Sequence, residues 1–222
     1  MVDPITLSAP AVDVLGEQLN LDVRQYPFEL PRPAEHGRSP QHVAAELAAS
    51  GLAAGDGPVP EVADALALLC GSEVAIAAAG LLDVRSGRRL TARVVATGEV
   101  GVLGLLDERG LRIDFLDPRS LPAVCADLLP QAPAAAGQPV RAERPGTPAL
   151  AEYTARPRFR IGHFLRTTRR GPAGPALTWF DTDLGRCTLV GETLPDGREV
   201  LTCAPAGRAA IAEAVAGMLG RV

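Results

Sequence analysis

Apolar residues recur at helical spacing over residues 1–72 and at strand spacing further along the chain. In the first stretch they return every three to four positions, as on the buried face of a helix. Three helices are predicted there: one capped by Ser8, one that begins at Ser39-Pro40 and one that begins at Pro60. Their inward residues are Val12, Leu15, Leu19, Val43, Leu47, Val62, Leu66 and Leu69.

After residue 73 the apolar period is two, and short runs of apolar residues are divided by glycine turns. This pattern is typical of an antiparallel meander. The predicted strands cover residues 74–82, 90–96, 100–106, 111–116, 158–161, 176–180, 187–190 and 199–203. A helix follows each group of strands, one from Asp117-Pro118 to residue 129 and one from Pro205 with Ile211 and Val215 on its inward face.

The two groups of strands look like two copies of one unit, and we interpret residues 73–129 and 158–219 as pseudo-repeats. The alternative, that a meander followed by a helix is simply a common arrangement, stays open. The sequence therefore predicts a mixed α/β (α+β) fold, with antiparallel β-meanders, flanking helices and two quasi-two-fold related halves. We expect one domain over residues 1–222, with an N-terminal helical segment over 1–72 and a linker over 130–157, where proline, alanine and glycine dominate.

Composition permits a large core and excludes some chemistry. Of the 222 residues, 47% are hydrophobic and 22% are charged, which is ordinary for a globular protein. All 22 basic residues are arginine, which indicates a GC-rich genome and excludes mechanisms that need lysine, such as a Schiff base or a Walker-type phosphate loop. The chain shows neither a long apolar span nor a signal-like start, so we expect a cytoplasmic protein without membrane insertion.

Four cysteines, Cys70, Cys125, Cys187 and Cys203, are scattered along the chain. Their spacing matches neither a CxxC pair nor a zinc pattern with histidine, so no metal is expected. We expect buried, reduced thiols, because cysteine packs in cores as a small hydrophobic residue.

Charge is distributed unevenly along the chain. Residues 1–72 carry ten acids and three arginines, and residues 150–222 carry ten arginines and seven acids, within a net charge of −4. The acidic total argues against general attraction to nucleic acid. A local cluster is entirely basic and consists of Arg156, Arg158, Arg160, Arg166, Arg169 and Arg170. Arg158 and Arg160 alternate with apolar residues, so we interpret the cluster as the solvated face of an edge-like strand, with an acidic protein or RNA as alternative partners.

For the other residues that could form a chemical site, the sequence pattern favours structural roles. Asp181-Thr182-Asp183 has the spacing of paired carboxylates, but Asp183 precedes a glycine turn, so turn capping is the preferred interpretation. Trp179 and Phe180 are expected to face opposite sides of a strand, which gives Trp179 a mainly structural role and leaves one exposed side as a contact surface. His36, His42 and His163 lie in no triad or metal motif. We expect neither catalytic residues nor a cofactor.

Several segments, taken in order, resemble the EspG family of actinobacterial type VII (ESX) secretion chaperones. The run Trp179-Phe180-Asp181-Thr182, which turns through Gly185-Arg186 into the next strand, resembles the family's late signature. Residues 158–164, with arginines, Gly162 and an aromatic, resemble its basic strand, and Tyr26-Pro27-Phe28 resembles a segment that follows its first helix. The chain departs from the family over residues 130–157, where the family has a helical bundle.

The resemblance implies an EspG-like α/β fold and a cytosolic chaperone without catalysis or cofactor. The implied partner is a secreted helical substrate of the PE–PPE type, bound at its helical tip. The loop between the first two long strands, here residues 84–89, would reach the partner through Arg85, Arg88 and Arg89. A homodimer is left open, and nucleic acid is not the expected partner.

Three other functions remain open from the sequence. The chain could be an interaction protein of the same fold without a chaperone role, which the shortened segment at 130–157 favours. It could be a regulatory protein that binds nucleic acid through the arginine cluster. It could also be a small hydrolase whose site is assembled only in space.

Overall fold

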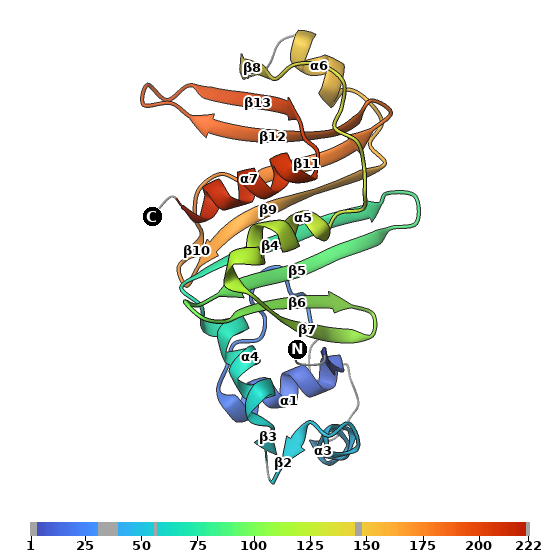
Figure 1. Cartoon of the computed structure of the whole chain (residues 1–222), viewed down its shortest axis with the longest axis vertical. Helices are drawn as coiled ribbons and strands as arrows, with labels where there is room; N and C mark the ends of the chain where they lie inside the picture. Colours follow the sequence, from blue (N-terminus) through green and yellow to red (C-terminus); the bar gives the residue numbers. More distant parts are fainter. Residues whose placement is uncertain (1–3, 31–39, 56, 145–147, 221–222) are drawn as a thin grey trace. The chain divides into compact units, whose positions relative to one another are not determined.

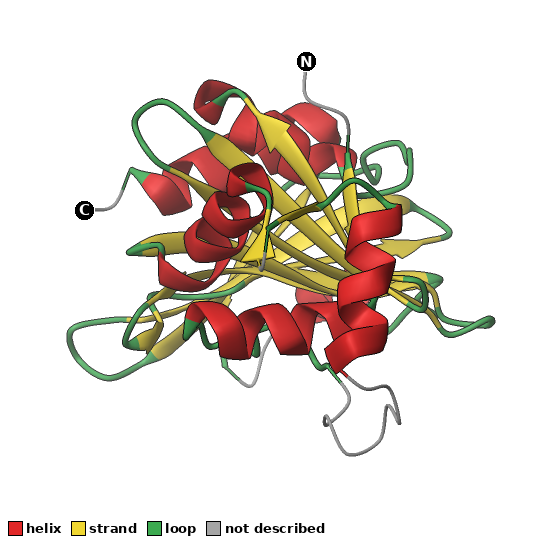
Figure 2. Cartoon of the chain, turned by 90° about the horizontal axis from the view of Figure 1, so that it is seen from below, coloured by secondary structure: helices red, strands yellow, loops and turns green. Residues whose placement is uncertain are grey.

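The computed structural model describes residues 4–30, 40–55, 57–144 and 148–220 (Figure 1). The elements, in chain order, are β1 (Ile5–Leu7), α1 (Ala9–Leu19), α3 (Pro40–Ala49), β2 (Ala53–Ala54), β3 (Gly57–Pro58), α4 (Pro60–Gly71), β4 (Val74–Asp83), β5 (Arg88–Ala96), β6 (Gly101–Asp107), β7 (Gly110–Leu116), η1 (Pro118–Ser120), α5 (Leu121–Asp127), β8 (Val140–Glu143), α6 (Pro148–Thr154), β9 (Arg160–Thr168), β10 (Gly171–Pro172), β11 (Leu177–Thr182), β12 (Gly185–Thr193), β13 (Glu199–Pro205) and α7 (Arg208–Leu219). In Figure 2 the helices flank the strands, as expected for an α+β arrangement.

The chain folds into two compact units. Unit 1 comprises Met1–Ala75 and Thr91–Pro118, and unit 2 comprises Ile76–Leu90 and Arg119–Val222. These boundaries pass through β4 and β5 and therefore differ from those of the pseudo-repeats. The order of elements nevertheless matches the predicted pseudo-repeats. Strands β4 to β7 precede α5, and strands β9, β11, β12 and β13 precede α7. Duplication itself stays a prediction.

Unit 1 packs three helices against the antiparallel strands β1, β7, β6 and β5. Helix α1 begins as the sequence predicts, because the Ser8 side chain accepts a hydrogen bond from the Ala11 amide at 3.3 Å. Helices α3 and α4 begin at Pro40 and Pro60, also as predicted, while Ser39 lies outside the described residues. The core residues predicted for these helices are buried, apart from Leu19, which is half-buried.

Three short strands of unit 1 were not predicted from the sequence. Strand β1 pairs with β7, with Ile5 opposite Ile113 and Leu7 opposite Leu111. Strands β2 and β3 form a separate two-stranded hairpin between α3 and α4. Strands of two or three residues leave no detectable period, so only their partners make them strands.

Unit 2 contains the strand order β4-β9-β11-β12-β13-β8, and β10 pairs with β9. Helices α5 and α7 pack against each other (Figure 1). Helix α7 begins at Arg208 rather than at the predicted Pro205, because Pro205 still pairs with Cys187 in the ladder between β13 and β12. Ile211 and Val215 face inward as predicted.

The prediction of a linker over residues 130–157 is wrong where β8 and α6 lie. Strand β8 pairs with β13, with Ala142 opposite Leu201. Ala134 forms a bridge to Arg186, and the Tyr153 hydroxyl donates to the carbonyl of Gln138 at 3.2 Å. Leu150 and Tyr153 of α6 are buried in the same cluster as Phe180 and Cys203. The segment thus joins the fold through partners that are distant in sequence.

The four cysteines are free thiols, and all except the half-buried Cys70 are buried, as the sequence predicts. Burial raises the pKa of Cys125 and of Cys203 to about 12 and that of Cys70 to about 11. Because the thiolate is the reactive form, we expect native protein at pH 8 to react slowly with Ellman's reagent, Cys70 first, and denatured protein to react at all four sites at once. Immediate labelling of three or four thiols in the native state would contradict this burial.

Candidate protein-interaction surface

The tip of the β4–β5 hairpin presents the three arginines that the sequence analysis selected. The structure turns over residues 84–87, so Arg85 lies in the turn, while Arg88 and Arg89 begin β5, and all three are exposed. The Asp83 carboxylate accepts hydrogen bonds from the amides of Arg85 at 2.8 Å and of Ser86 at 3.2 Å. These bonds hold the pKa of Asp83 below its ordinary value and fix the turn.

The signature run 179–186 builds a buried ion pair in unit 2. Asp181 and Arg186 lie opposite each other on β11 and β12 and form two hydrogen bonds, from Nε at 2.7 Å and from Nη2 at 2.9 Å. Arg186 Nη2 also donates to the carbonyl of Pro130 at 2.7 Å. The guanidinium lies over the ring of Trp179 at 5.6 Å. The motif therefore ties the β11–β12 hairpin to the chain that follows α5.

This geometry corrects the interpretation of Asp181-Thr182-Asp183. Thr182 caps the turn, because its hydroxyl accepts from the Leu184 amide at 3.2 Å. Asp183 is exposed and pairs with Arg156 at 2.6 Å, while Asp181 is buried. The contact surface expected beside Trp179 is also absent, since Trp179 and Phe180 are 0% and 1% exposed. Arg186 lies over the Trp179 ring and Arg158 over the Phe180 ring.

The basic cluster on and before β9 is partly neutralised by two acids, Asp181 on β11 and Asp183 in the turn that follows it. Arg160 pairs with Asp181 at 3.0 Å, and Arg156 pairs with Asp183. Arg158 lies over the Phe180 ring and donates to the Thr154 carbonyl at 2.9 Å. Arg158 is exposed, as the solvated-face interpretation expects, whereas Arg160 is half-buried against Asp181. Phe159 is exposed too, because β9 begins only at Arg160 and the alternation of the strand starts there.

The two described histidines, His42 and His163, belong to different units. His36 lies outside the described residues, and His42 is exposed on α3. His163 on β9 is half-buried, and desolvation lowers its pKa. Within the described ranges, histidine, cysteine and acidic side chains form no group that could hold a metal ion.

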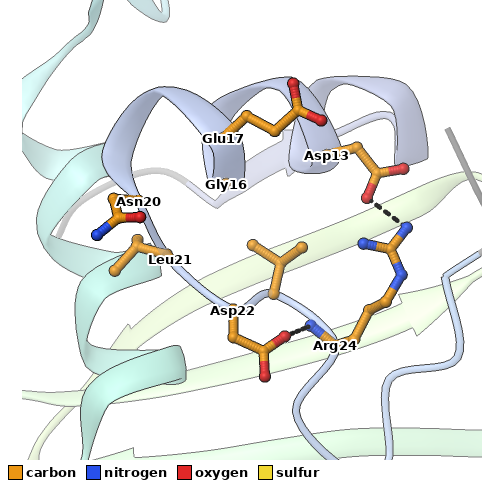
Figure 3. Close-up of a pocket in the computed structure, with 8 residues that line it drawn as sticks. Asp13, Gly16, Glu17, Asn20, Leu21, Asp22 and Arg24 are labelled. Atoms are coloured by element: carbon orange, nitrogen blue, oxygen red, sulfur yellow. Dashed lines mark hydrogen bonds and ion pairs between the residues drawn. The ribbon is translucent and has the colours of Figure 1, made fainter.

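Two surface cavities are candidate sites, and each is lined by charged and apolar residues without a catalytic pattern. One, of about 460 Å³ in unit 1, lies at the end of α1, where Asp13 pairs with Arg24 at 2.8 Å (Figure 3). The other, of about 550 Å³ in unit 2, lies beside the end of α5, where Arg208 binds Asp127 and lowers its pKa. The residues that line these two cavities include no serine, threonine, cysteine or histidine, so neither cavity pairs such a nucleophile with a base.

The fold is an α+β scaffold with antiparallel strands and flanking helices, and the signature residues stabilise it from within. In the described ranges, no helix combines the length and the apolar character that a membrane span needs. A model of the EspG family matches residues 8–217, and the chain belongs to the EspG family.

A solved structure with the same fold is that of the Mycobacterium tuberculosis type VII secretion system chaperone EspG5 in complex with the PE25–PPE41 dimer. The TM-score is 0.73 at 15% sequence identity, over 98% of this chain and 96% of that chain. The search of curated proteins finds no match. The fold class and the family predicted from the sequence are thus confirmed.

Proposed function

We propose that this chain is a cytosolic type VII secretion chaperone that binds a PE–PPE-like substrate pair and keeps it soluble before export. The observation that carries the proposal is the likeness to EspG5 along nearly the whole chain, because EspG5 was solved with the PE25–PPE41 dimer bound. Membership of the EspG family supports the same function.

The physical task of such a chaperone is to cover apolar surface. A helical tip with exposed apolar residues associates with itself in water, and a protein that buries the tip prevents this. Binding of this kind needs shape and charge complementarity and no reaction. A chain whose signature residues stabilise its own fold suits that task.

The test of the function is co-expression with PE–PPE pairs from the source genome, with PE25–PPE41 as a reference pair. We expect at least one pair to remain soluble and to co-elute with the chain in size-exclusion chromatography. Failure of every pair to bind would overturn the proposal. Stable binding without any gain in the solubility of the pair would favour the alternative of an interaction protein without a chaperone role.

The arginine hairpin is the proposed contact for the partner. Changing Arg85, Arg88 and Arg89 to glutamate is expected to weaken binding of the substrate pair about tenfold or more, because like charges then meet across the interface. Isothermal titration calorimetry would measure the change.

A matched control lies in the β6–β7 turn. Arg109 follows Asp107 there, and its amide donates to the Asp107 carboxylate at 2.7 Å, as the Arg85 amide donates to Asp83. Arg109→Glu should leave the affinity unchanged. Equal affinities for wild type and the triple variant would remove the hairpin from the interface.

A further inference from the structure

The cavity of about 550 Å³ in unit 2 lies where α5 ends and α7 begins. Its wall is mainly apolar and includes Leu129 and Pro130, while Arg186, Arg208 and Asp127 supply its charged groups. A concave site of this volume, with an apolar lining and a few charged groups, has the usual form of a site for a small organic molecule. The balance of charge around the cavity indicates which kind of molecule fits.

The ionic groups around the cavity carry an excess of positive charge. Asp181 is shared by two arginines, since it pairs with the buried Arg186 at 2.7 Å and with the half-buried Arg160 at 3.0 Å. Arg208 is matched by Asp127, to which it donates two hydrogen bonds. Three arginines therefore face two aspartates. A buried cation that is only partly compensated attracts an anion, because the protein interior solvates its charge poorly.

Each of the two arginines in the cavity lining keeps one unused donor nitrogen. Arg186 donates from Nε and Nη2 to Asp181 and from Nη2 to the Pro130 carbonyl, and its Nη1 donates to none of the described residues. Arg208 uses Nε and Nη2 for Asp127, and its Nη1 likewise has no acceptor in the described part of the chain. Because the Arg186 side chain is 3% exposed and lines the cavity, the cavity is where a ligand can reach its Nη1.

Helix α7 begins at this cavity and adds to its positive potential. Its N-cap residue, Gly207, has no side chain that could accept from the first amides, and the first turn of the helix contains no acid. The aligned peptide dipoles of α7 therefore leave partial positive charge at the end that Arg208 brings to the cavity. A ligand with a negative charge is stabilised there as well.

The wall of the cavity is fixed before any ligand binds. The backbone of Arg186 donates from its amide to the Pro133 carbonyl at 2.8 Å, and its carbonyl accepts from the amides of Ala135 at 2.9 Å and Ala206 at 3.0 Å. These bonds hold the chain that follows α5 against β12 and against the start of α7. A ligand would therefore lose little affinity to the cost of ordering its site.

We propose that this cavity binds an organic monocarboxylate with a short apolar body. The carboxylate accepts hydrogen bonds from Nη1 of Arg186 and of Arg208, and the apolar body packs against Leu129 and Pro130. Charge-assisted bonds from guanidinium groups are among the strongest that a carboxylate can accept. One negative charge matches the single positive charge in excess, which favours a monoanion over the dianion of phosphate. The site lies outside the proposed chaperone function and does not depend on it.

Trp179 makes the binding measurable, because it is the only tryptophan and its ring lies 5.6 Å from the Arg186 guanidinium. Titration of the full-length chain with hexanoate should change the tryptophan fluorescence until the site is saturated. Acetate, which lacks the apolar body, should bind at least about tenfold more weakly. Hexan-1-ol, which lacks the charge, should also bind at least about tenfold more weakly. Inorganic phosphate serves as the competing anion and should displace hexanoate only weakly.

The exposed ion pair at the cavity gives two variants with opposite expected effects. Arg208→Gln should weaken hexanoate binding about fivefold or more, because Asp127 then faces the carboxylate without its counter-ion. Asp127→Asn should tighten hexanoate binding about threefold or more, because Arg208 is then released for the ligand. Ala132→Phe, at a half-buried position of the wall, should abolish binding by filling the cavity. Opposite signs for the first two variants cannot arise from a general loss of folding.

A matched control lies in the turn between β12 and β13. Arg198 is an exposed arginine that pairs with Asp196 and Glu143, and Arg198→Gln should leave hexanoate binding unchanged. Urea unfolding of each variant checks that the fold is intact. Equal responses to hexanoate and hexan-1-ol, tighter binding of phosphate than of hexanoate, or equal weakening by Arg198→Gln and Arg208→Gln would each overturn the inference. An Asp127→Asn variant that binds hexanoate no better than wild type would do the same.

Discussion

Asp181→Ala is expected to lower the free energy of unfolding by about 3–5 kcal/mol. Arg186 is 3% exposed at its side chain and would keep its charge, with only the Pro130 carbonyl and the Trp179 ring left to compensate it. A buried charge without its counter-ion carries a large desolvation cost, since the interior solvates it poorly. Urea titration followed by tryptophan fluorescence would measure the loss, because Trp179 lies in the affected unit.

The control for this prediction is two residues away on the same chain. Asp183→Ala removes an exposed ion pair with Arg156, and exposed pairs of this kind contribute at most about 1 kcal/mol. A double change, Asp181→Leu with Arg186→Met, should recover part of the loss, because neither charge is then left buried. A loss below about 1 kcal/mol for Asp181→Ala would show that the pair does not stabilise the hairpin.

Gly162→Ala is expected to destabilise unit 2 by about 3 kcal/mol. A Cβ atom at residue 162 would lie 2.5 Å from the Ala79 carbonyl oxygen and 2.7 Å from Cζ2 of the buried Trp179. Moving either neighbour would cost free energy, since one is backbone of β4 and the other is a side chain packed in the core. Gly80 faces the same close approach from β4, where a Cβ would meet the Cα of Gly162. Thermal unfolding would measure the effect.

A matched control for Gly162→Ala is available in α7. Gly217 lies inside that helix, and a Cβ there would meet nothing within 4 Å. Gly217→Ala should therefore stabilise the chain by about 0.5–1 kcal/mol, because alanine favours the helix more than glycine does. Opposite signs for the two substitutions are the decisive result. A neutral Gly162→Ala would mean that β4 and β9 can separate to admit a methyl group.

Part of the candidate surface could be predicted from the sequence. Arg85, Arg88 and Arg89 were selected because the resemblance to the family assigns partner contact to the loop between the first two long strands, and the structure puts them at an exposed hairpin tip. The exposure of Phe159 was not predicted, because alternation of apolar residues with Arg158 and Arg160 is typical of a strand with one buried face. The proline at residue 157 is a signal that could have delayed the predicted start of the strand by a residue or two.

The pairing of Asp181 with Arg186 could also have been predicted from the sequence. The predicted turn at residues 183–185 places these two residues opposite each other on a hairpin, where opposite charges attract. Periodicity could not show that both are buried. Their burial depends on the residues after α5, which lie far away in the chain and contribute the Pro130 carbonyl.

Sequence alone determined the elements whose stability is local. Ser8, Pro40 and Pro60 set helix starts through their own backbone and side-chain chemistry, and two-residue periodicity located the long strands. Tertiary structure alone decided β1, β8 and α6, the burial of Asp181 and the exposure of Phe159. The two strands, the helix and the buried Asp181 each depend on a partner distant in sequence, such as Ile113 for Ile5 or Leu201 for Ala142. A short or proline-rich segment has too little local preference to form structure until such a partner supplies hydrogen bonds and buries its apolar surface.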